Sequence, residues 1–268
     1  MQLTLQGRLA DTLLLTYRTP AESVRALLPE GLELVQRGPW AFWSVVCCKV
    51  EHLRPGGLPA ALGASFHHVA YRLRVQAMTA SAEVIDGLYF THSDADAPLP
   101  VLFDALGNKL TDLRLHPAAI ALEGGDDAVQ LDVGAPGCRL RLEAAHAPAA
   151  LQPDSCFATV EDARSFGRYP PAALSVHPAK QDASRRELHV MRVERVDSAW
   201  CETPVVLRAA ELGYFDSLGQ TGLAELEWAV RLRPMDYRWV LGEKRAVLGS
   251  HKSVATWPRA KAIEKGVA

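Results

Sequence analysis

The chain has 268 residues, of which 49% are hydrophobic and 22% are charged, and its formal net charge at pH 7 is -2. These are the proportions of an ordinary globular protein, and the length suits one large β-rich domain. The small net charge gives no electrostatic attraction to nucleic acid or to anionic lipid, so neither is expected as a partner. No segment approaches the ~20 consecutive apolar residues that a transmembrane helix needs.

The first residues, MQLTLQGRLAD, alternate polar and apolar side chains, whereas a signal peptide has a charged start and an apolar block. The five cysteines include no C-x-x-C pair, which argues against a disulfide framework and against a zinc site. Cys47 and Cys48 are adjacent in a strand-like run, so their side chains should point to opposite faces. We therefore expect a cytoplasmic protein with buried free thiols, no bound metal and no cofactor.

Strand signals dominate the chain. About a dozen short runs alternate in polarity or are rich in β-branched and aromatic residues, and turn residues separate many of them. These runs are 2–9, 12–17, 40–51, 66–76, 82–91, 112–122, 128–133, 138–144, 188–197, 203–210, 224–233 and 237–241. They predict a mainly β (α+β) fold with a few short helices, built on a curved antiparallel β-sheet that forms a barrel or a sandwich. We expect a single domain over residues 1–241 and a C-terminal tail over 242–268.

Two of the expected helices have recognisable ends. Residues 19–22 (TPAE) have the pattern of a capping box with proline at the first helical position, and Pro29 should end that helix. Another helix is expected near 160–166, beginning at Thr159 with an acidic residue three positions later and stopping at Gly167.

A further helix is expected at 98–106, and the residues before it allow two interpretations. On an extended chain His92, Asp94 and Asp96 would share one face, as metal ligands could. However, Asp94 or Asp96 would also serve as the N-cap of this helix, and capping explains both acids without an ion. We therefore expect caps at this position.

Lys109 follows this helix and has apolar neighbours on both sides. A lysine held in an apolar cavity has a lowered pKa, because desolvation destabilises its charged form. The neutral amine can then form a Schiff base with a carbonyl substrate. A solvated cation at a helix end is the alternative interpretation. The G-x-S-x-G, P-loop and G-x-G-x-x-G signatures are absent, which weakens hydrolase and nucleotide-binding interpretations.

Several segments in order resemble the acetoacetate decarboxylases, over most of residues 8–240. They are DTLLLTYRT at 11–19, LPEGLE at 28–33, LGASFH at 62–67, the strand with Tyr89-Phe90, and 193–207. A related, largely uncharacterised branch of that superfamily shares the Pro-Glu-Gly-Leu-Glu turn and a segment like RPGGLP at 54–59. The resemblance implies a decarboxylase-type barrel, a small-molecule substrate and a homo-oligomer.

The resemblance also implies site residues. It makes Lys109 the Schiff-base lysine, places His67 where the family has a pocket glutamate, and matches Arg8 to the pocket arginine. In the family a second lysine lies beside the reactive one, whereas here its neighbours are an asparagine and a leucine. An arginine would then have to supply the activating charge: Arg72, Arg74 or Arg114.

Two functions follow from these residues. In the first, Lys109 forms a Schiff base with a small keto acid or carbonyl compound, Arg8 holds a carboxylate and His67 moves protons. Decarboxylation, aldol cleavage or dehydration could follow from the same iminium. In the second, the barrel cavity binds a small molecule without chemistry. A third and weaker hypothesis is a metal-dependent hydrolase that uses His67, His68 and His92.

Overall fold

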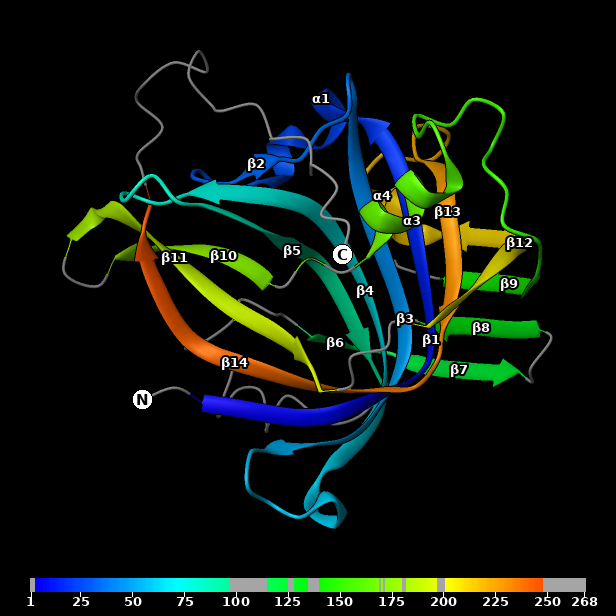
Figure 1. Cartoon of the computed structure of the whole chain (residues 1–268), viewed down its shortest axis with the longest axis horizontal. Helices are drawn as coiled ribbons and strands as arrows, with labels where there is room; N and C mark the ends of the chain where they lie inside the picture. Colours follow the sequence, from blue (N-terminus) through cyan, green and yellow to red (C-terminus); the bar gives the residue numbers. More distant parts are fainter. Residues whose placement is uncertain are drawn as a thin grey trace, which may run out of the picture.

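The structure is a computed structural model that describes residues 3–96, 115–124, 128–134, 140–168, 170, 172–179, 182–196 and 201–247. Within these residues, seven strands close into a barrel in the order β14-β11-β10-β5-β4-β3-β1, and β14 pairs with β1 (Figure 1). The strands are β1 (Leu3–Pro20), β3 (Trp40–Pro55), β4 (Ala64–Met78), β5 (Val84–Ala95), β10 (Ala172–Ala179), β11 (Asp182–Arg195) and β14 (Met235–Ala246). All neighbours are antiparallel except β5 and β10, which are parallel.

A second group of strands continues from β1. The N-terminal half of β1 pairs with β14, and the C-terminal half of β1 pairs with β13. From there the order runs β13-β12-β9-β8-β7. The strands are β7 (Ala119–Gly124), β8 (Ala128–Gly134), β9 (Leu140–His146), β12 (Glu202–Leu212) and β13 (Glu225–Leu232). Two short strands lie off this path: β2 (Glu33–Leu34) pairs with β4, and β6 (Leu115–Pro117) pairs in parallel with β5.

Helical segments are few and short among the described residues. They are α1 (Ala21–Val24), α3 (Val160–Gly167), α4 (Gly213–Ser217) and two 3-10 turns, Arg25–Leu27 and Ala60–Leu62. In this part of the chain no helix is both long and apolar enough to cross a membrane.

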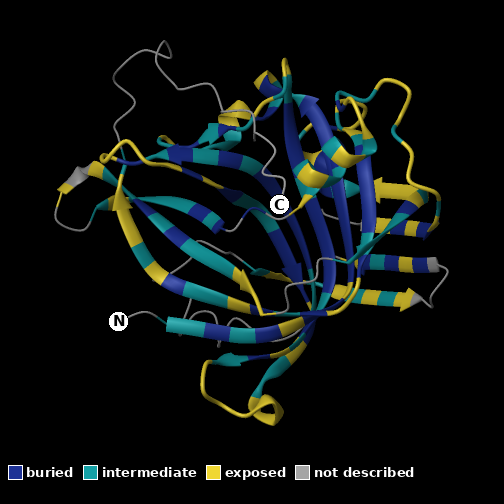
Figure 2. Ribbon diagram, in the orientation of Figure 1, coloured by how far each residue is buried: buried dark blue, intermediate teal, exposed yellow. Residues whose placement is uncertain are grey.

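The two faces of the barrel wall belong to two apolar cores. Leu13, Val45 and Tyr71 on the outer face pack in the same core as Leu131 and Leu142 of the second sheet. The inner core is a separate cluster that includes Leu14, Val46, Phe66 and Tyr237. Strands β1, β3, β4 and β13 are therefore buried along most of their length, whereas β12 and β14 show many exposed residues (Figure 2). Cys47 and Cys48 fall in different cores, as their adjacency predicted.

The predicted β-rich barrel is confirmed, with differences in the strands. The predicted runs 2–9 and 12–17 form one continuous strand, β1. An irregularity joins them: Asp11 adopts a left-handed φ of 43°, and the register with β3 shifts between Ala10 and Leu13 without ending the strand. Asp is one of the few residues that tolerates this conformation. The chain continues in β14 past residue 241, and the expected tail beyond Val247 lies outside the described residues.

The helix predictions met different outcomes. Helix α3 is confirmed, with the Asp162 N–H donating to Thr159 Oγ1 at 3.1 Å. The capping box at 19–22 is wrong, since β1 runs through Pro20 and α1 begins at Ala21 with no side-chain cap. Thr19 Oγ1 instead donates to Gln220 Oε1 at 2.7 Å. The helix expected at 98–106 lies outside the described residues.

Candidate functional site

Two adjoining cavities lie inside the barrel. We call the first, of about 90 Å³, the apolar cavity; it is lined by Leu5, Val50, Leu53, Phe66, His68, Phe90, Leu115, Met191, Trp239 and Leu241. The second, of about 100 Å³, we call the arginine cavity; it is lined by Leu9, Val46, Cys48, Val50, His68, Arg72, Leu88, Phe90, Pro170, Ala172, Ala173, Met191, Val193, Tyr237 and Trp239. All seven barrel strands contribute to this combined lining. The cavities are therefore the interior of the barrel.

His68 on β4 borders both cavities. Its Nε2 atom is buried and has no hydrogen-bond partner among the described residues. Burial, reinforced by the nearby charge of Arg72, lowers the pKa of His68 to about 3. The imidazole is therefore neutral near pH 7, and it presents a polar nitrogen in surroundings that are otherwise nearly all apolar. An unsatisfied buried polar atom is costly, so this nitrogen is a natural partner for a ligand.

Arg72 lies four residues further along the same strand and borders the arginine cavity. Arg72 is only 6% exposed and donates two hydrogen bonds to Ser44. Nε donates to the Ser44 carbonyl oxygen at 3.2 Å, and Nη2 donates to Ser44 Oγ at 2.9 Å. The ring of Phe90 lies 5.6 Å from the guanidinium carbon. Arg72 thus supplies a fixed positive charge beside the cavity, which favours an anionic group there.

The site residues predicted from the sequence lie elsewhere, as far as they are described. His67 points away from the cavities: Asp96 accepts from its backbone N–H and contacts its Nδ1, each at 2.7 Å. Arg8 is exposed and borders an open surface depression that also contains Glu51 and Asp236. Lys109 lies outside the described residues. The roles proposed for these three residues therefore stay predictions.

His92, Asp94 and His116 come together on the outer face of β5 and β6. One potential ligand atom from each lies within 4.8 Å of the others. His92 Nε2 is 2.9 Å from Asp94 Oδ1, and the ring of His92 is stacked on that of His116 with centroids 4.4 Å apart and planes 13° apart. Ring lone pairs that lie in parallel, stacked planes do not converge on one ion. The geometry as it stands is therefore that of a hydrogen-bonded stack.

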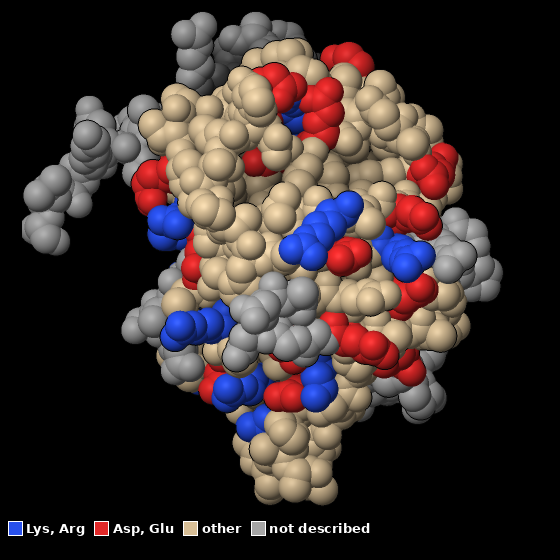
Figure 3. Space-filling view, turned by 90° about the vertical axis from the view of Figure 1, so that its right-hand side faces the viewer, with Lys and Arg blue, Asp and Glu red and all other residues tan. Residues whose placement is uncertain are grey.

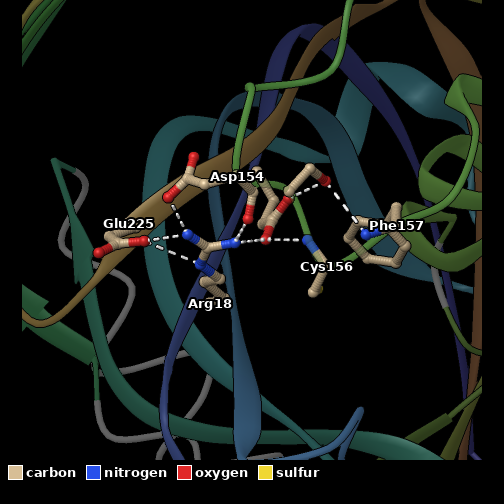
Figure 4. Close-up of polar contacts among 7 residues, drawn as sticks. Arg18, Asp154, Cys156, Phe157 and Glu225 are labelled. Carbon is tan, nitrogen blue, oxygen red and sulfur yellow. Dashed lines mark hydrogen bonds and ion pairs between the residues drawn. The ribbon is translucent and has the colours of Figure 1, made fainter.

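Arg18 is at the centre of a polar cluster that joins β1, β13 and the segment before α3 (Figure 4). Its guanidinium donates to Glu225 Oε2 from Nε at 2.8 Å, to Glu227 Oε1 from Nη1 at 2.9 Å, and also to Asp154. The backbone N–H of Cys156 donates to the same Glu227 oxygen at 3.1 Å. These bonds fasten the segment before α3 to β1 and β13. We interpret the cluster as structural.

Surface charge adds little to the choice of function. On the face shown in Figure 3, acidic and basic side chains of the described residues are interspersed among larger uncharged areas. This mixture agrees with the small net charge of the whole chain.

Solved structures with the same fold define the class. An acetoacetate decarboxylase-like enzyme from Sphingomonas wittichii RW1 superposes with a TM-score of 0.58 at 17% identity, covering 92% of this chain and 93% of that one. The acetoacetate decarboxylase from Legionella pneumophila gives 0.52 at 12% identity, with 91% and 88% covered. The enduracididine biosynthesis enzyme MppR, complexed with pyruvate, gives 0.54 at 13% identity, with 93% and 91% covered. The chain therefore has the acetoacetate decarboxylase-like fold.

The family follows from the sequence. The model of the DUF2071 family, described as an uncharacterized conserved protein, matches residues 6–178. This is more than half of the chain, which therefore belongs to that family. No curated protein matches the sequence.

Sequence reasoning missed His68 and Arg72 as cavity residues, although it used both. The alternation of a strand showed that only one of His67 and His68 could face the interior. It did not show which, because the closure of the barrel, and not the local sequence, determines which face of β4 lies inside.

Proposed function

We propose that the chain binds a small keto acid or related carbonyl compound inside the barrel and that Lys109 forms a Schiff base with it. The observation that carries this proposal is the pair of cavities lined from all seven barrel strands, both of which are bordered by His68, a residue whose Nε2 atom is buried and has no hydrogen-bond partner among the described residues. The acetoacetate decarboxylase-like fold supports it, as does the pyruvate complex of MppR.

In the proposed reaction the Lys109 amine adds to the substrate carbonyl, and water leaves to give an iminium. The iminium nitrogen accepts the electron pair when a neighbouring C–C bond breaks, and a proton then returns to carbon. We propose that the neutral imidazole of His68 forms a hydrogen bond with the reacting group and that Arg72 binds the substrate carboxylate. These two residues border the cavities, so we prefer them to His67 and Arg8 as the polar groups that contact the substrate.

Borohydride trapping tests the proposal. Incubation of the protein with acetoacetate or pyruvate and borohydride should leave a reduced adduct on Lys109, located by mass spectrometry of peptides. Lys49 and Lys244, whose side chains form ion pairs with acidic neighbours, are internal controls that should stay unmodified. Lys109→Arg should abolish the adduct. An unmodified Lys109 with every keto acid tried would overturn the proposal.

The apolar character of the lining favours one alternative, a protein that binds a small molecule without chemistry. Such a protein would retain a ligand in native mass spectrometry and gain thermal stability from it without turnover. Lys109→Ala would leave both effects unchanged, whereas the Schiff-base proposal requires that it remove the adduct.

A further inference from the structure

The two cavities adjoin each other and have unlike linings. They share Val50, His68, Phe90, Met191 and Trp239, so they adjoin each other at these residues. The lining that belongs to the apolar cavity alone is entirely hydrocarbon: Leu5, Leu53, Phe66, Leu115 and Leu241. The lining that belongs to the arginine cavity alone includes the charged side chain of Arg72.

Each cavity restricts what it can accept. A polar or charged group in the apolar cavity would lose its hydration and find only carbon around it beyond the shared His68 and Trp239. A carboxylate in the arginine cavity would face Arg72, whose plane is fixed by its two bonds to Ser44. Met191, in the shared part, has an unbranched side chain that can adjust to the ligand.

We infer that the barrel accepts amphipathic acids: a carboxylate at Arg72, the reacting region beside His68, and an unbranched hydrocarbon chain in the apolar cavity. This inference rests on the proposed function only in that both use the same cavities. It names the substrate class as keto acids that carry an alkyl chain, in preference to the shortest keto acids.

Saturated acids test the inference without Schiff-base chemistry, since they have no ketone to react with Lys109. Binding of butanoate, hexanoate and octanoate to the wild-type chain would be measured by titration calorimetry at pH 7. Affinity should rise about fourfold for each added CH₂ group until the apolar cavity is full. The primary alcohols of the same lengths should bind more weakly than the acids. Equal affinity at all lengths, or alcohols that bind as well as acids, would overturn the inference.

Variants in the two cavities separate the two contributions. Leu53→Phe should weaken octanoate binding and leave butanoate binding unchanged, because it fills the apolar cavity. Arg72→Met should weaken every acid about tenfold or more and spare the alcohols. Arg74→Met is the matched control: Arg74 lies two residues further along β4, donates to the Phe166 carbonyl and borders neither cavity. An effect of Arg74→Met equal to that of Arg72→Met would contradict the assignment.

The outcomes also separate this inference from the proposed function. If affinity rises with chain length but no borohydride adduct forms on Lys109, the inferred ligand class is supported and the Schiff-base reaction is overturned. If short keto acids form the adduct but affinity does not depend on chain length, the Schiff-base reaction is supported and the inferred ligand class is overturned. Circular dichroism checks that each variant is folded. If Arg72→Met does not fold, the wild-type ligand series and Leu53→Phe still decide the question.

Discussion

Arg18 and Glu227 are charged residues that the fold buries at the top of β1 and β13, with side chains only 6% and 1% exposed. Burial disfavours the charged guanidinium, but the hydrogen bonds that it donates to Glu225 and Asp154 and the negative charge of Glu227 outweigh burial and raise the pKa of Arg18. A buried ion pair contributes little net stability, yet losing one partner is costly because the other charge remains.

We therefore expect Arg18→Met to lower the free energy of unfolding by about 3–5 kcal/mol, measured by urea denaturation. Arg25→Met is the control, since Arg25 forms an exposed pair with Glu22 at 3.4 Å. Such pairs contribute roughly 0–1 kcal/mol. If the two variants were equally stable, the Arg18 cluster would not contribute to holding the segment before α3 against β1 and β13.

His68 should make the protein sensitive to acid. The pKa of an exposed histidine is about 6.5, whereas burial lowers that of His68 to about 3. Between these values the unfolded chain binds more protons than the folded chain, so stability is full above pH 6.5 and is lost as the pH falls toward 3.

His68→Met should remove this dependence, which amounts to about 2 kcal/mol between pH 7 and pH 5. Urea denaturation at pH 7, 6 and 5 measures it, with His67→Met as the matched change at the neighbouring residue outside the cavities. Wild-type and His68→Met curves that lose stability in parallel would place the acid sensitivity in other groups.

At the level of elements, the parallel junction of β5 and β10 depends on a glycine. A Cβ atom at Gly87 would lie 2.5 Å from Leu174 Cγ and 3.0 Å from the Ala172 carbonyl oxygen, both on β10. Close approach of the two strands therefore requires a residue without a side chain.

We expect Gly87→Ala to destabilise the protein by about 1–3 kcal/mol through this overlap. Gly134→Ala, also in a strand, is the control, because its nearest contacts with Ala119 would be at an ordinary 3.9 Å. Thermal denaturation compares the two. If both substitutions change the melting temperature equally, the close approach of β5 and β10 at Gly87 does not require a glycine.

Local signals predicted some elements and failed at others for identifiable reasons. Helix α3 followed from Thr159 and Gly167 because its cap is formed within the helix's own first turn. The capping box at 19–22 failed because Thr19 bonds with Gln220, a residue 201 positions away. Strand β10 was missed altogether. The ordered resemblance to a known family identified the barrel, which alternation alone did not distinguish from a sandwich.

The candidate site was less predictable than the fold, because cavity residues are chosen by the curvature of the whole barrel. Alternation limited the choice to one of two adjacent histidines, but which face of β4 lies inside depends on the closure of the barrel. Arg72 was considered only as a source of charge. Its position beside the cavity depends on the closure of the barrel, which brings β4 and β5 together with residues of β10, β11 and β14 around one cavity.

For the whole molecule, closure of the barrel makes β3 an internal strand with both faces covered. Cys47 belongs to the outer core and Cys48 to the inner core, and their residues are 0% and 4% exposed. Burial raises the pKa of both thiols, that of Cys48 to about 12. Both thiols therefore stay protonated in the folded chain, and reagents that attack thiolates should react with them chiefly when both layers open together.

Alkylation kinetics test this cooperativity. In the native protein, N-ethylmaleimide should modify the partly exposed Cys201 at least about a thousandfold faster than Cys47 and Cys48, in line with the stability of a folded domain. Subdenaturing urea should accelerate Cys47 and Cys48 together, because one global unfolding event exposes both faces of β3. Peptide mass spectrometry follows each site, and Cys201→Ser should remove the Cys201 product alone. Modification of Cys48 well ahead of Cys47 would instead show that the barrel interior opens while the outer core stays packed.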